Sequence, residues 1–217
     1  VVANATRPLA MAHINATFEG ASAHAGKNPS GGTNAMQAMT TAVQNAYGIP
    51  RHADGLTRIN FGRVEGGSAS NVIAEEVVLD GEVRGETTAL MEYMRTELER
   101  ELYAAAELHQ CDVVIHRTSE SIRVDGDPTL AGTVADVAHD RPSVRTVTEA
   151  APLGASEDAT FLMQRVHERG GRAVYLLVGT DHPTAHHTPT FDVDERSLDI
   201  GVELLTACVT AVAEDRP

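Results

Sequence analysis

Tryptophan is absent from this 217-residue sequence, and aromatic side chains make up only 4% of it. Any core must therefore be built mainly from aliphatic side chains. Long apolar runs are missing as well, since none approaches the roughly 20 residues that a helix needs to cross a bilayer. The first residues show neither a basic segment nor a signal-like apolar stretch. The sequence therefore predicts a globular protein that does not partner a membrane.

Basic residues are also scarce, and Lys27 is the only lysine. The 31 acidic residues outnumber the 17 Lys and Arg residues, which gives a formal net charge of -14. A field of that sign repels phosphate, so nucleic acids and anionic lipids are excluded as partners. An acid excess with little Lys is typical of proteins from salt-loving organisms, although a GC-rich genome also favours Arg over Lys. We expect the fold to need salt to screen its own repulsion.

Only two cysteines are present, Cys111 and Cys208, and their spacing does not match a metal site. Each lies in an apolar segment, which favours buried free thiols over the alternative, a disulfide. Free thiols indicate a reducing, cytoplasmic environment. The sequence begins at Val1 without an initiator Met, so we expect the chain to start inside a longer parent protein.

The first part of the sequence has the element order β-α-β-β-α-β. Within residues 9–20, apolar side chains alternate with polar ones, which is the period of a half-buried strand. The segments that follow with strand or helix patterns are 36–46 (helix), 56–64 and 72–85 (strands), 88–109 (helix) and 113–115 (strand). This order predicts an α+β fold, a ferredoxin-like sheet with two helices on one face. Val83 shares a face of its strand with other apolar residues, so Arg84 points to the opposite face, where it is either solvated or available to a ligand.

Beyond about residue 120 the pattern changes to helix, strand, helix. Helices are expected over 127–139, over 157–169 with Ser156 as N-cap, and toward the C-terminus from about Leu198. The continuous apolar run 173–178 suits a strand that is buried on both faces. This unit is not a complete α/β domain, because its strand lacks neighbours, so the missing strands are expected to come from elsewhere.

One polar segment, TDHPTAHHTPTFDVDE, is rich in possible metal ligands. It holds three imidazoles and three carboxylates: His182, His186, His187, Asp181, Asp192 and Asp194. Imidazoles clustered after a buried strand can bind a divalent metal, and a nearby carboxylate can orient the ring. The alternative is a polar surface loop, and spacing alone does not decide because no complete ligand set is present.

Three further segments have a functional and a structural interpretation. His24, in a glycine-rich loop, could polarise a carbonyl group or could be an ordinary exposed His. Asn71, in GGSASNV, could receive a carboxylate or belong to a simple hairpin turn, and Arg84, thirteen residues later, would be its bidentate partner. Residues 154–158 open a helix that could accept an anion, or that is merely capped and acidic in its first turn.

Taken in order, these segments resemble the superfamily of two-metal amidohydrolases that includes the aminoacylases and glutamate carboxypeptidases. The matching stretches are SAHAG with NPSGGTNA, IPRHADGLTRIN, GGSASNVI followed by GEVRG, APLGASEDATFLM, and AHHTPTFDVDE. IPRHADGLTRIN and GASEDAT resemble in particular one type of chain found in the p-aminobenzoyl-glutamate hydrolases. The resemblance covers nearly the whole sequence and rests on separate motifs in the correct order.

The resemblance implies three parts. Residues 1–8 would end a connection from a catalytic domain, residues 9–117 would form the lid through which such enzymes dimerise, and residues 118–217 would close a zinc-peptidase-like catalytic domain. As partners it implies a small N-acyl amino acid substrate and a second protein chain, identical or homologous, bound through the lid.

The resemblance also implies roles for four residues. His187 matches a metal ligand, and His24 matches the lid His that polarises the scissile carbonyl, often in the site of the other chain of a dimer. Asn71 and Arg84 match the residues that hold the substrate carboxylate. The substrate would be an aminobenzoyl-like amide of glutamate or a similar amino acid.

In such enzymes two divalent metal ions, zinc or manganese, hold a water molecule and lower its pKa while a Glu moves the proton. The family's first ligands, a His-x-Asp motif, a bridging Asp and a Glu-Glu pair, are missing from this sequence. Glu75 and Glu76 match that pair only in letters, because they lie in a lid strand. We therefore expect this chain alone neither to bind two metals fully nor to hydrolyse amides.

Two other hypotheses compete with the hypothesis that this chain is part of a hydrolase. One is a non-catalytic dimerisation or binding module that retains the lid. The other is a small His-rich metal-binding protein that uses His182, His186 and His187. The sequence encoded upstream of Val1 would separate the first two hypotheses, and a metal titration with His187→Ala would test the third.

Overall fold

The computed structural model describes residues 2–181, 184 and 188–214. The chain divides into two compact units. Unit 1 combines residues 1–8, 124–155 and 159–217, and unit 2 combines residues 9–123 with residues 156–158.

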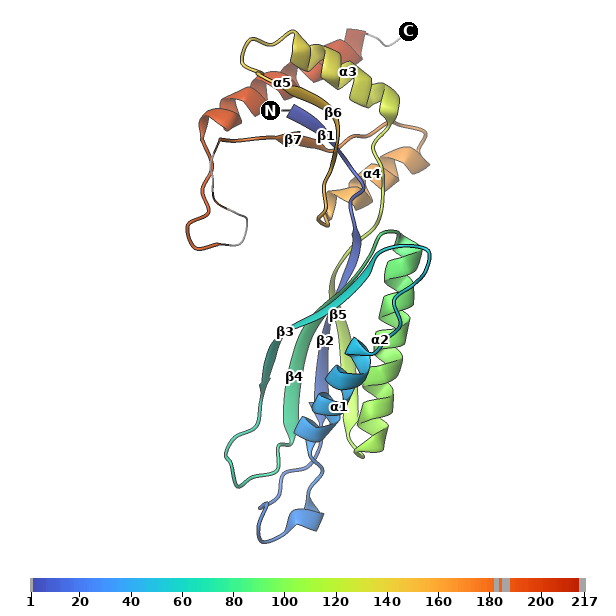
Figure 1. The fold of residues 1–217 in the computed structure, drawn as a ribbon, viewed down its shortest axis with the longest axis vertical. Coiled ribbons are helices and arrows are strands. Elements are labelled where there is room, and N and C mark those ends of the chain that lie inside the picture. Colours follow the sequence, from blue (N-terminus) through green and yellow to red (C-terminus); the bar gives the residue numbers. More distant parts are fainter. Residues whose placement is uncertain (1, 182–183, 185–187, 215–217) are drawn as a thin grey trace. The chain divides into compact units, whose positions relative to one another are not determined.

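Unit 2 is a four-stranded antiparallel sheet with two helices on one face (Figure 1). Its elements in chain order are β2 (Ala10–Glu19), the short 3-10 turn η1 (Pro29–Gly31), α1 (Ala35–Tyr47), β3 (Thr57–Gly66), β4 (Glu76–Gly85), α2 (Thr88–Leu108) and β5 (Asp112–Ser121). The strands lie in the order β3-β4-β2-β5, so β3 and β5 form the two edges. The predicted α+β, ferredoxin-like fold is therefore confirmed. Because β5 runs to Ser121, unit 2 continues to Arg123, beyond the boundary expected at residue 117.

The core of unit 2 follows from the alternation in β2. Every second residue of this strand is buried, from Ala10 to the fully buried Phe18. Across the neighbouring strand, Val77, Leu79 and Val83 face the same helices. The opposite face of the sheet carries the polar residues of the same strands, which include Arg84, as its position in the strand predicts.

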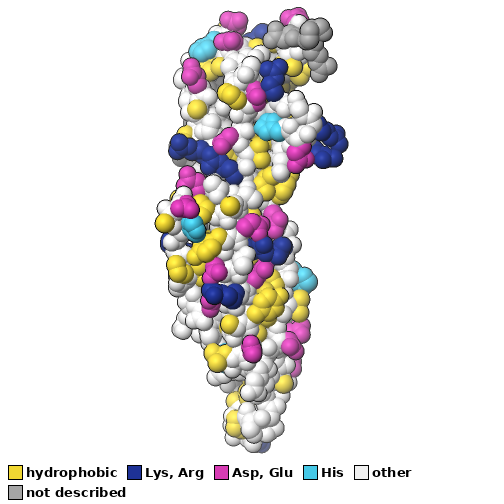
Figure 2. Space-filling model, turned by 90° about the vertical axis from the view of Figure 1, so that its right-hand side faces the viewer, with side chains coloured by type: hydrophobic (Ala, Val, Ile, Leu, Met, Phe, Trp, Pro, Cys, Tyr) yellow, Lys and Arg dark blue, Asp and Glu magenta, His cyan; other side chains and the backbone are white. Residues whose placement is uncertain are grey.

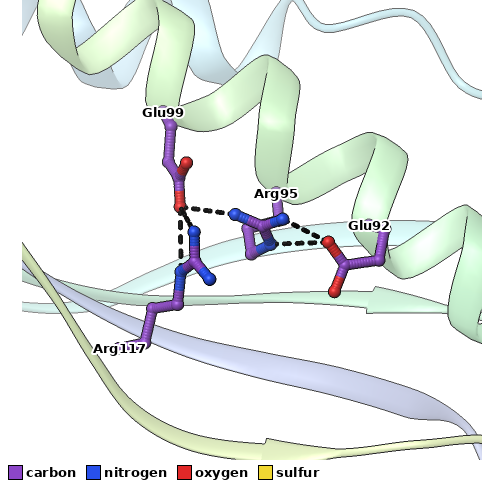
Figure 3. Close-up of polar contacts among 4 residues, drawn as sticks. All are labelled: Glu92, Arg95, Glu99 and Arg117. Atoms are coloured by element: carbon purple, nitrogen blue, oxygen red, sulfur yellow. Dashed lines mark hydrogen bonds and ion pairs between the residues drawn. The ribbon is translucent and has the colours of Figure 1, made fainter.

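Helix α2 is the longest element of unit 2, and polar contacts cap its start and connect it to strand β5. Thr87 caps it by accepting a hydrogen bond from the Leu90 backbone N–H at 3.2 Å. Arg95 contacts Glu92 and Glu99 on the same helix, and Glu99 also accepts from Arg117 of β5 at 3.1 Å (Figure 3). The hydrogen bond to Glu92 raises the pKa of Arg95, and the bond to Glu99 acts in the same direction. This network ties the helix to an edge strand.

The start of α2 lies against the end of β4, and glycine makes this approach possible. A Cβ atom placed on Gly85 would lie 2.2 Å from the Met91 backbone nitrogen and 2.8 Å from the Thr87 carbonyl oxygen. Only glycine, which has no Cβ atom, fits at this position. The residue that precedes this glycine is Arg84, so the close contact fixes the backbone beside a candidate site residue.

Unit 1 contains a three-stranded sheet and three helices. Its elements are β1 (Val2–Thr6), α3 (Pro128–His139), β6 (Val147–Pro152), α4 (Ala159–Glu168), β7 (Leu176–Val178) and α5 (Arg196–Glu214). The strand order is β6-β1-β7, with β1 parallel to β6 and antiparallel to β7. A small core joins α3 to α5 through Val134, Ala138, Leu204 and Cys208.

Several expectations for unit 1 need correction. Strands β1 and β6 were not predicted. β1 pairs with β7 of the apolar run 173–178, and β6 pairs with the other side of β1. Within that run only residues 176–178 form a strand, and its side chains are half-buried rather than buried on both faces. Ser156 does not cap α4, because the helix begins at Ala159 and the Ser156 hydroxyl is buried without a hydrogen-bond partner among the described residues.

One face of α5 is apolar and exposed. Leu198, Val202, Leu205 and Val209 recur at helical spacing and are between 57% and 71% exposed. Leu204 and Cys208 on the neighbouring face of the helix contact the core. Both cysteines of the chain are free and buried, as predicted. Within the described residues, no helix is both long enough and apolar enough to cross a membrane.

Candidate functional site

His24 lies in the exposed loop that follows β2. Its Nδ1 accepts hydrogen bonds from the backbone N–H groups of Gly26 and Lys27 at 3.1 and 3.2 Å. A nitrogen that accepts carries no proton, so in the neutral ring the proton lies on Nε2. The loop therefore holds the imidazole with its donor nitrogen directed away from its own backbone. Such a group can donate a hydrogen bond to a carbonyl oxygen.

The Asn71 segment is hydrogen-bonded directly to the His24 loop. His24 and Val72 form an isolated β-bridge, and the Ala25 backbone N–H donates to the Asn71 carbonyl oxygen at 2.9 Å. The Ile73 N–H donates to the Ala23 carbonyl at the same distance, 2.9 Å. Two segments far apart in the sequence thus lie side by side at one end of the sheet. Figure 2 shows that this end of unit 2 presents few charged or apolar side chains on the face in view.

Arg84 lies on the helix-free face of β4, and Glu82 fixes its guanidinium group. The Nε donates to Glu82 Oε1 at 2.8 Å and the Nη2 donates to Oε2 at 3.0 Å. His13, opposite Glu82 on β2, places its Nε2 3.1 Å from the same Oε2. Glu82 engages one edge of the guanidinium, and within the described residues no other acceptor contacts the edge formed by Nη1 and Nη2, which leaves this edge available to a ligand.

The charge state of Glu82 supports this arrangement. The hydrogen bond from Arg84 lowers the pKa of Glu82, desolvation opposes the shift, and the charge of Arg84 and the contact with His13 add to the lowering. Glu82 is therefore ionised at neutral pH. The Arg84–Glu82 pair is a charge-assisted contact that restricts the rotation of the guanidinium.

The predicted site residues separate into two groups at opposite ends of the sheet. Asn71 precedes β4 and His24 follows β2, whereas Arg84 lies near the far end of β4, opposite Met11 at the start of β2. At about 3.4 Å per residue, the strand advances about 27 Å between Glu76 and Arg84. Asn71 and Arg84 of one chain therefore do not meet at a single carboxylate.

Three polar residues of this face were not singled out by sequence reasoning: Glu82, His13 and Arg58. Strand parity could have found Glu82, because residues 82 and 84 share a face. Arg58 required the pairing of β3 with β4, in which it lies directly opposite Arg84. The sequence alone does not contain that register.

In unit 1, the predicted ligand His187 and its neighbours His182 and His186 lie outside the described residues. Residues on both sides of this segment, together with residues 143–146, line a cavity of about 480 Å³. In it Arg145 contacts Asp181 at 2.6 Å, and Arg196 contacts Asp194. Hydrogen bonds from Arg196 lower the pKa of Asp194. In the part of the chain that the structure describes, no three His, Cys, Asp or Glu side chains gather as a metal-ligand set.

Three strands of the sheet and both helices lie in a segment that matches a known domain. Residues 4–109 match the M20 peptidase dimerisation domain. Over these residues the chain therefore has the dimerisation domain of the M20 peptidases, and similar proteins are named as hydrolases.

The names of similar proteins are more specific than the name of the domain. A homolog of a p-aminobenzoyl-glutamate hydrolase chain, from Haemophilus influenzae, is 34% identical over 96% of this chain and 49% of that protein. An indole-3-acetyl-aspartic acid hydrolase from Enterobacter agglomerans is 32% identical over 94% of this chain and 47% of that protein. The solved aminobenzoyl-glutamate utilization protein from Klebsiella pneumoniae superposes with a TM-score of 0.83 at 27% identity, over 95% of this chain and 50% of that one. The chain spans about half the length of these relatives.

Proposed function

We propose that this chain is the lid and closing segment of a metal-dependent amidohydrolase. The whole protein would cleave the amide bond between an aminobenzoyl-like acyl group and glutamate or a similar amino acid. The observation that carries this proposal is the Arg84–Glu82 pair, a guanidinium fixed on one edge and available on the other. It occurs in a chain whose relatives are named hydrolases of glutamate and aspartate amides. The substrate carboxylate would bind the available edge of Arg84.

The two ends of the sheet support a site shared between protomers. One lid cannot place both Arg84 and the His24–Asn71 loops on one small substrate, because about 27 Å of strand separates them. In a symmetric dimer each site would receive Arg84 from one protomer, with His24 and Asn71 from its partner. His24 Nε2 would then donate a hydrogen bond to the scissile carbonyl, and the Asn71 side chain would contact the substrate carboxylate.

Two divalent metal ions, zinc or manganese, would complete the site, and His187 would supply one ligand to them. When bound, these ions would lower the pKa of a water molecule for attack on the amide. The residues described here would hold and orient the substrate. Such orientation accounts for a large share of the rate acceleration of enzymes. We also propose a cytoplasmic location, which the two free thiols support.

Mixing two inactive variants tests the shared site. In the complete protein that contains this chain, His24→Ala and Arg84→Gln should each abolish most hydrolysis of p-aminobenzoyl-glutamate. Co-expressed at equal levels, they should form heterodimers in which one site carries both changes and the other carries neither. Random pairing makes half of the dimers mixed, so about a quarter of the wild-type activity should return.

Two outcomes would contradict the proposal. If mixing restores no activity while each variant still dimerises in light scattering, the site is not shared in this way. If the complete wild-type protein hydrolyses no glutamate amide with zinc or manganese, the chain is better described as a dimerisation or binding module. Arg63→Gln is a suitable control, since Arg63 is exposed on β3 and pairs with Asp80 and Glu65.

A further inference from the structure

Arg58 and Arg84 form a pair of guanidinium groups on the helix-free face of the sheet. They are direct partners in the β3–β4 ladder, so their Cα atoms lie about 4.5–5.5 Å apart and both side chains leave the sheet on the same side. The flanking residues Thr57 and Ile59 are buried on the helix side, which confirms the direction of Arg58.

Two positive charges directly across a ladder destabilise a sheet, so their pairing calls for an explanation. Glu82 compensates only one of them, because both of its oxygens engage Arg84. Arg58 donates from Nη1 to the Thr57 carbonyl at 2.9 Å, and within the described residues no carboxylate forms an ion pair with it. Arg63 on the same strand, by contrast, pairs with two carboxylates. The Arg58–Arg84 pair therefore retains an excess of positive charge in a strongly acidic protein.

A β-bulge in β3 creates this pairing. Near the turn, Gly66 pairs with Val77 and Arg63 with Asp80, and continuing that register would bring Ile59 opposite Arg84. The register shifts by one residue between Phe61 and Arg63, which moves Arg58 into that position instead. A one-residue shift reverses the faces of a strand, so the bulge turns Arg58 toward Arg84 and Ile59 into the core.

We propose that Arg58 determines specificity for a second carboxylate, so that Arg58 and Arg84 together receive an amino acid with two carboxylates. This inference rests on the proposed function, in which Arg84 holds the first carboxylate. In an extended glutamate the two carboxylate carbons are about 5 Å apart, which matches the separation of two residues across a ladder. Two guanidinium groups would neutralise both charges of such a ligand, whereas Glu82 orients one of them without occupying its outer edge.

The test compares two amides that differ only in the second carboxylate. The complete, metal-loaded protein containing this chain is assayed with p-aminobenzoyl-L-glutamate and p-aminobenzoyl-L-glutamine, and binding of both is also measured on the metal-free protein by calorimetry. Wild type should favour the glutamate amide by about tenfold or more in KM, the usual effect of losing one charge-assisted contact. Arg58→Gln should raise KM for the glutamate amide about tenfold, with kcat and the glutamine amide little changed. Arg84→Gln should weaken both ligands.

Controls separate specificity from folding. Removing one of two like charges should not lower the stability of the sheet, so Arg58→Gln is expected to melt no earlier than wild type. Arg58→Lys should keep part of the preference because it keeps the charge. Arg63→Gln should leave both KM values unchanged.

Each contrary outcome has a distinct meaning. If wild type hydrolyses both amides with equal KM, or if Arg58→Gln weakens both equally, the role of Arg58 is wrong while the proposed hydrolase stands. If neither amide is hydrolysed or bound by wild type, the proposed function fails and this inference fails with it.

Discussion

Replacing Gly85 by Ala should strongly destabilise unit 2. The added Cβ would lie 2.2 Å from the Met91 nitrogen and 2.7 Å from the Leu90 carbonyl carbon. Both are backbone atoms, so no side-chain rotation relieves the overlap, and the start of α2 must move by roughly 1 Å or more. Overpacking of this kind costs about 1–3 kcal/mol, and a contact made only with backbone belongs at the upper end.

Gly62→Ala provides the matched control in the same sheet. Around Gly62, a new Cβ would meet only the Asn60 side-chain nitrogen, at 3.9 Å. Alanine should therefore be neutral there, or slightly stabilising because it restricts the unfolded chain. The two variants carry the same chemical change, and they differ only in what surrounds it.

Thermal unfolding followed by circular dichroism measures the contrast. For a unit that spans residues 9–123, a loss of about 3 kcal/mol corresponds to a melting temperature about 10 °C lower or more. Because Arg84 is the adjacent residue, Gly85→Ala should also weaken substrate binding in the complete protein. A Gly85→Ala variant that melts within about 1 °C of Gly62→Ala would refute the inferred close approach of α2 to β4.

Three further predictions concern charge. Arg95→Met should lower the free energy of unfolding by about 1–2 kcal/mol in urea titrations. The substitution leaves Glu92 without its cation and Glu99 with Arg117 alone. As a control, Arg100→Met on the exposed side of α2 should change the free energy of unfolding by less than about 0.5 kcal/mol. With a net charge of -14, the protein should melt at higher temperature as KCl is added, and a melting temperature that does not rise would contradict a need for screening. The pKa of Glu82 is lower in the folded state than in the unfolded state. Its stabilising contribution is therefore present above the unfolded pKa of about 4.3 and is lost as pH falls through the folded pKa. In acid titrations of stability, Glu82→Gln should lack this pH-dependent loss.

The fold of unit 2 was predictable because its signals are local. The alternation in β2 and the stripe of Leu90, Met94, Leu98 and Leu102 in α2 each define a buried face without knowledge of neighbours. Strands β1 and β6 lack such signals. Their sequences, VANAT and VTEAAP, are short and contain small or polar residues, and each is held by pairing with the other. Such strands follow from tertiary contacts rather than from sequence pattern.

The helix pattern of α5 shows a related limit. An apolar stripe from Leu198 to Val209 was visible in the sequence, but this stripe is the exposed side in the described structure. The core instead uses Leu204 and Cys208, which lie on the neighbouring face of the helix. Periodicity identifies apolar faces, and it does not say which of two faces a given neighbour covers.

For the candidate site, the alternation of faces along one strand could be predicted from the sequence, and the pairing register between two strands could not. Parity along one strand is enough to turn Arg84 away from the helices, and it could equally have identified Glu82. The partnership of Arg58 with Arg84 depends on a single-residue bulge, and counting back from the turn would have placed Ile59 there. A cross-strand pair of functional residues therefore cannot be predicted by counting from the turn when a bulge lies between the pair and the turn.

The length of the strands in unit 2 determines which residues can cooperate. A ten-residue strand such as β4 is long enough to carry a different polar group at each end, with the bridged loops of His24 and Asn71 at one and the clamped Arg84 at the other. Motifs only thirteen residues apart in sequence are thus separated by more than the length of a small substrate. If these residues act on one molecule, a two-fold partner must bring the loop end of one sheet to the arginine end of another. Unit 2 would then contribute to catalysis as a pair of sheets, and dimerisation would be a condition of activity.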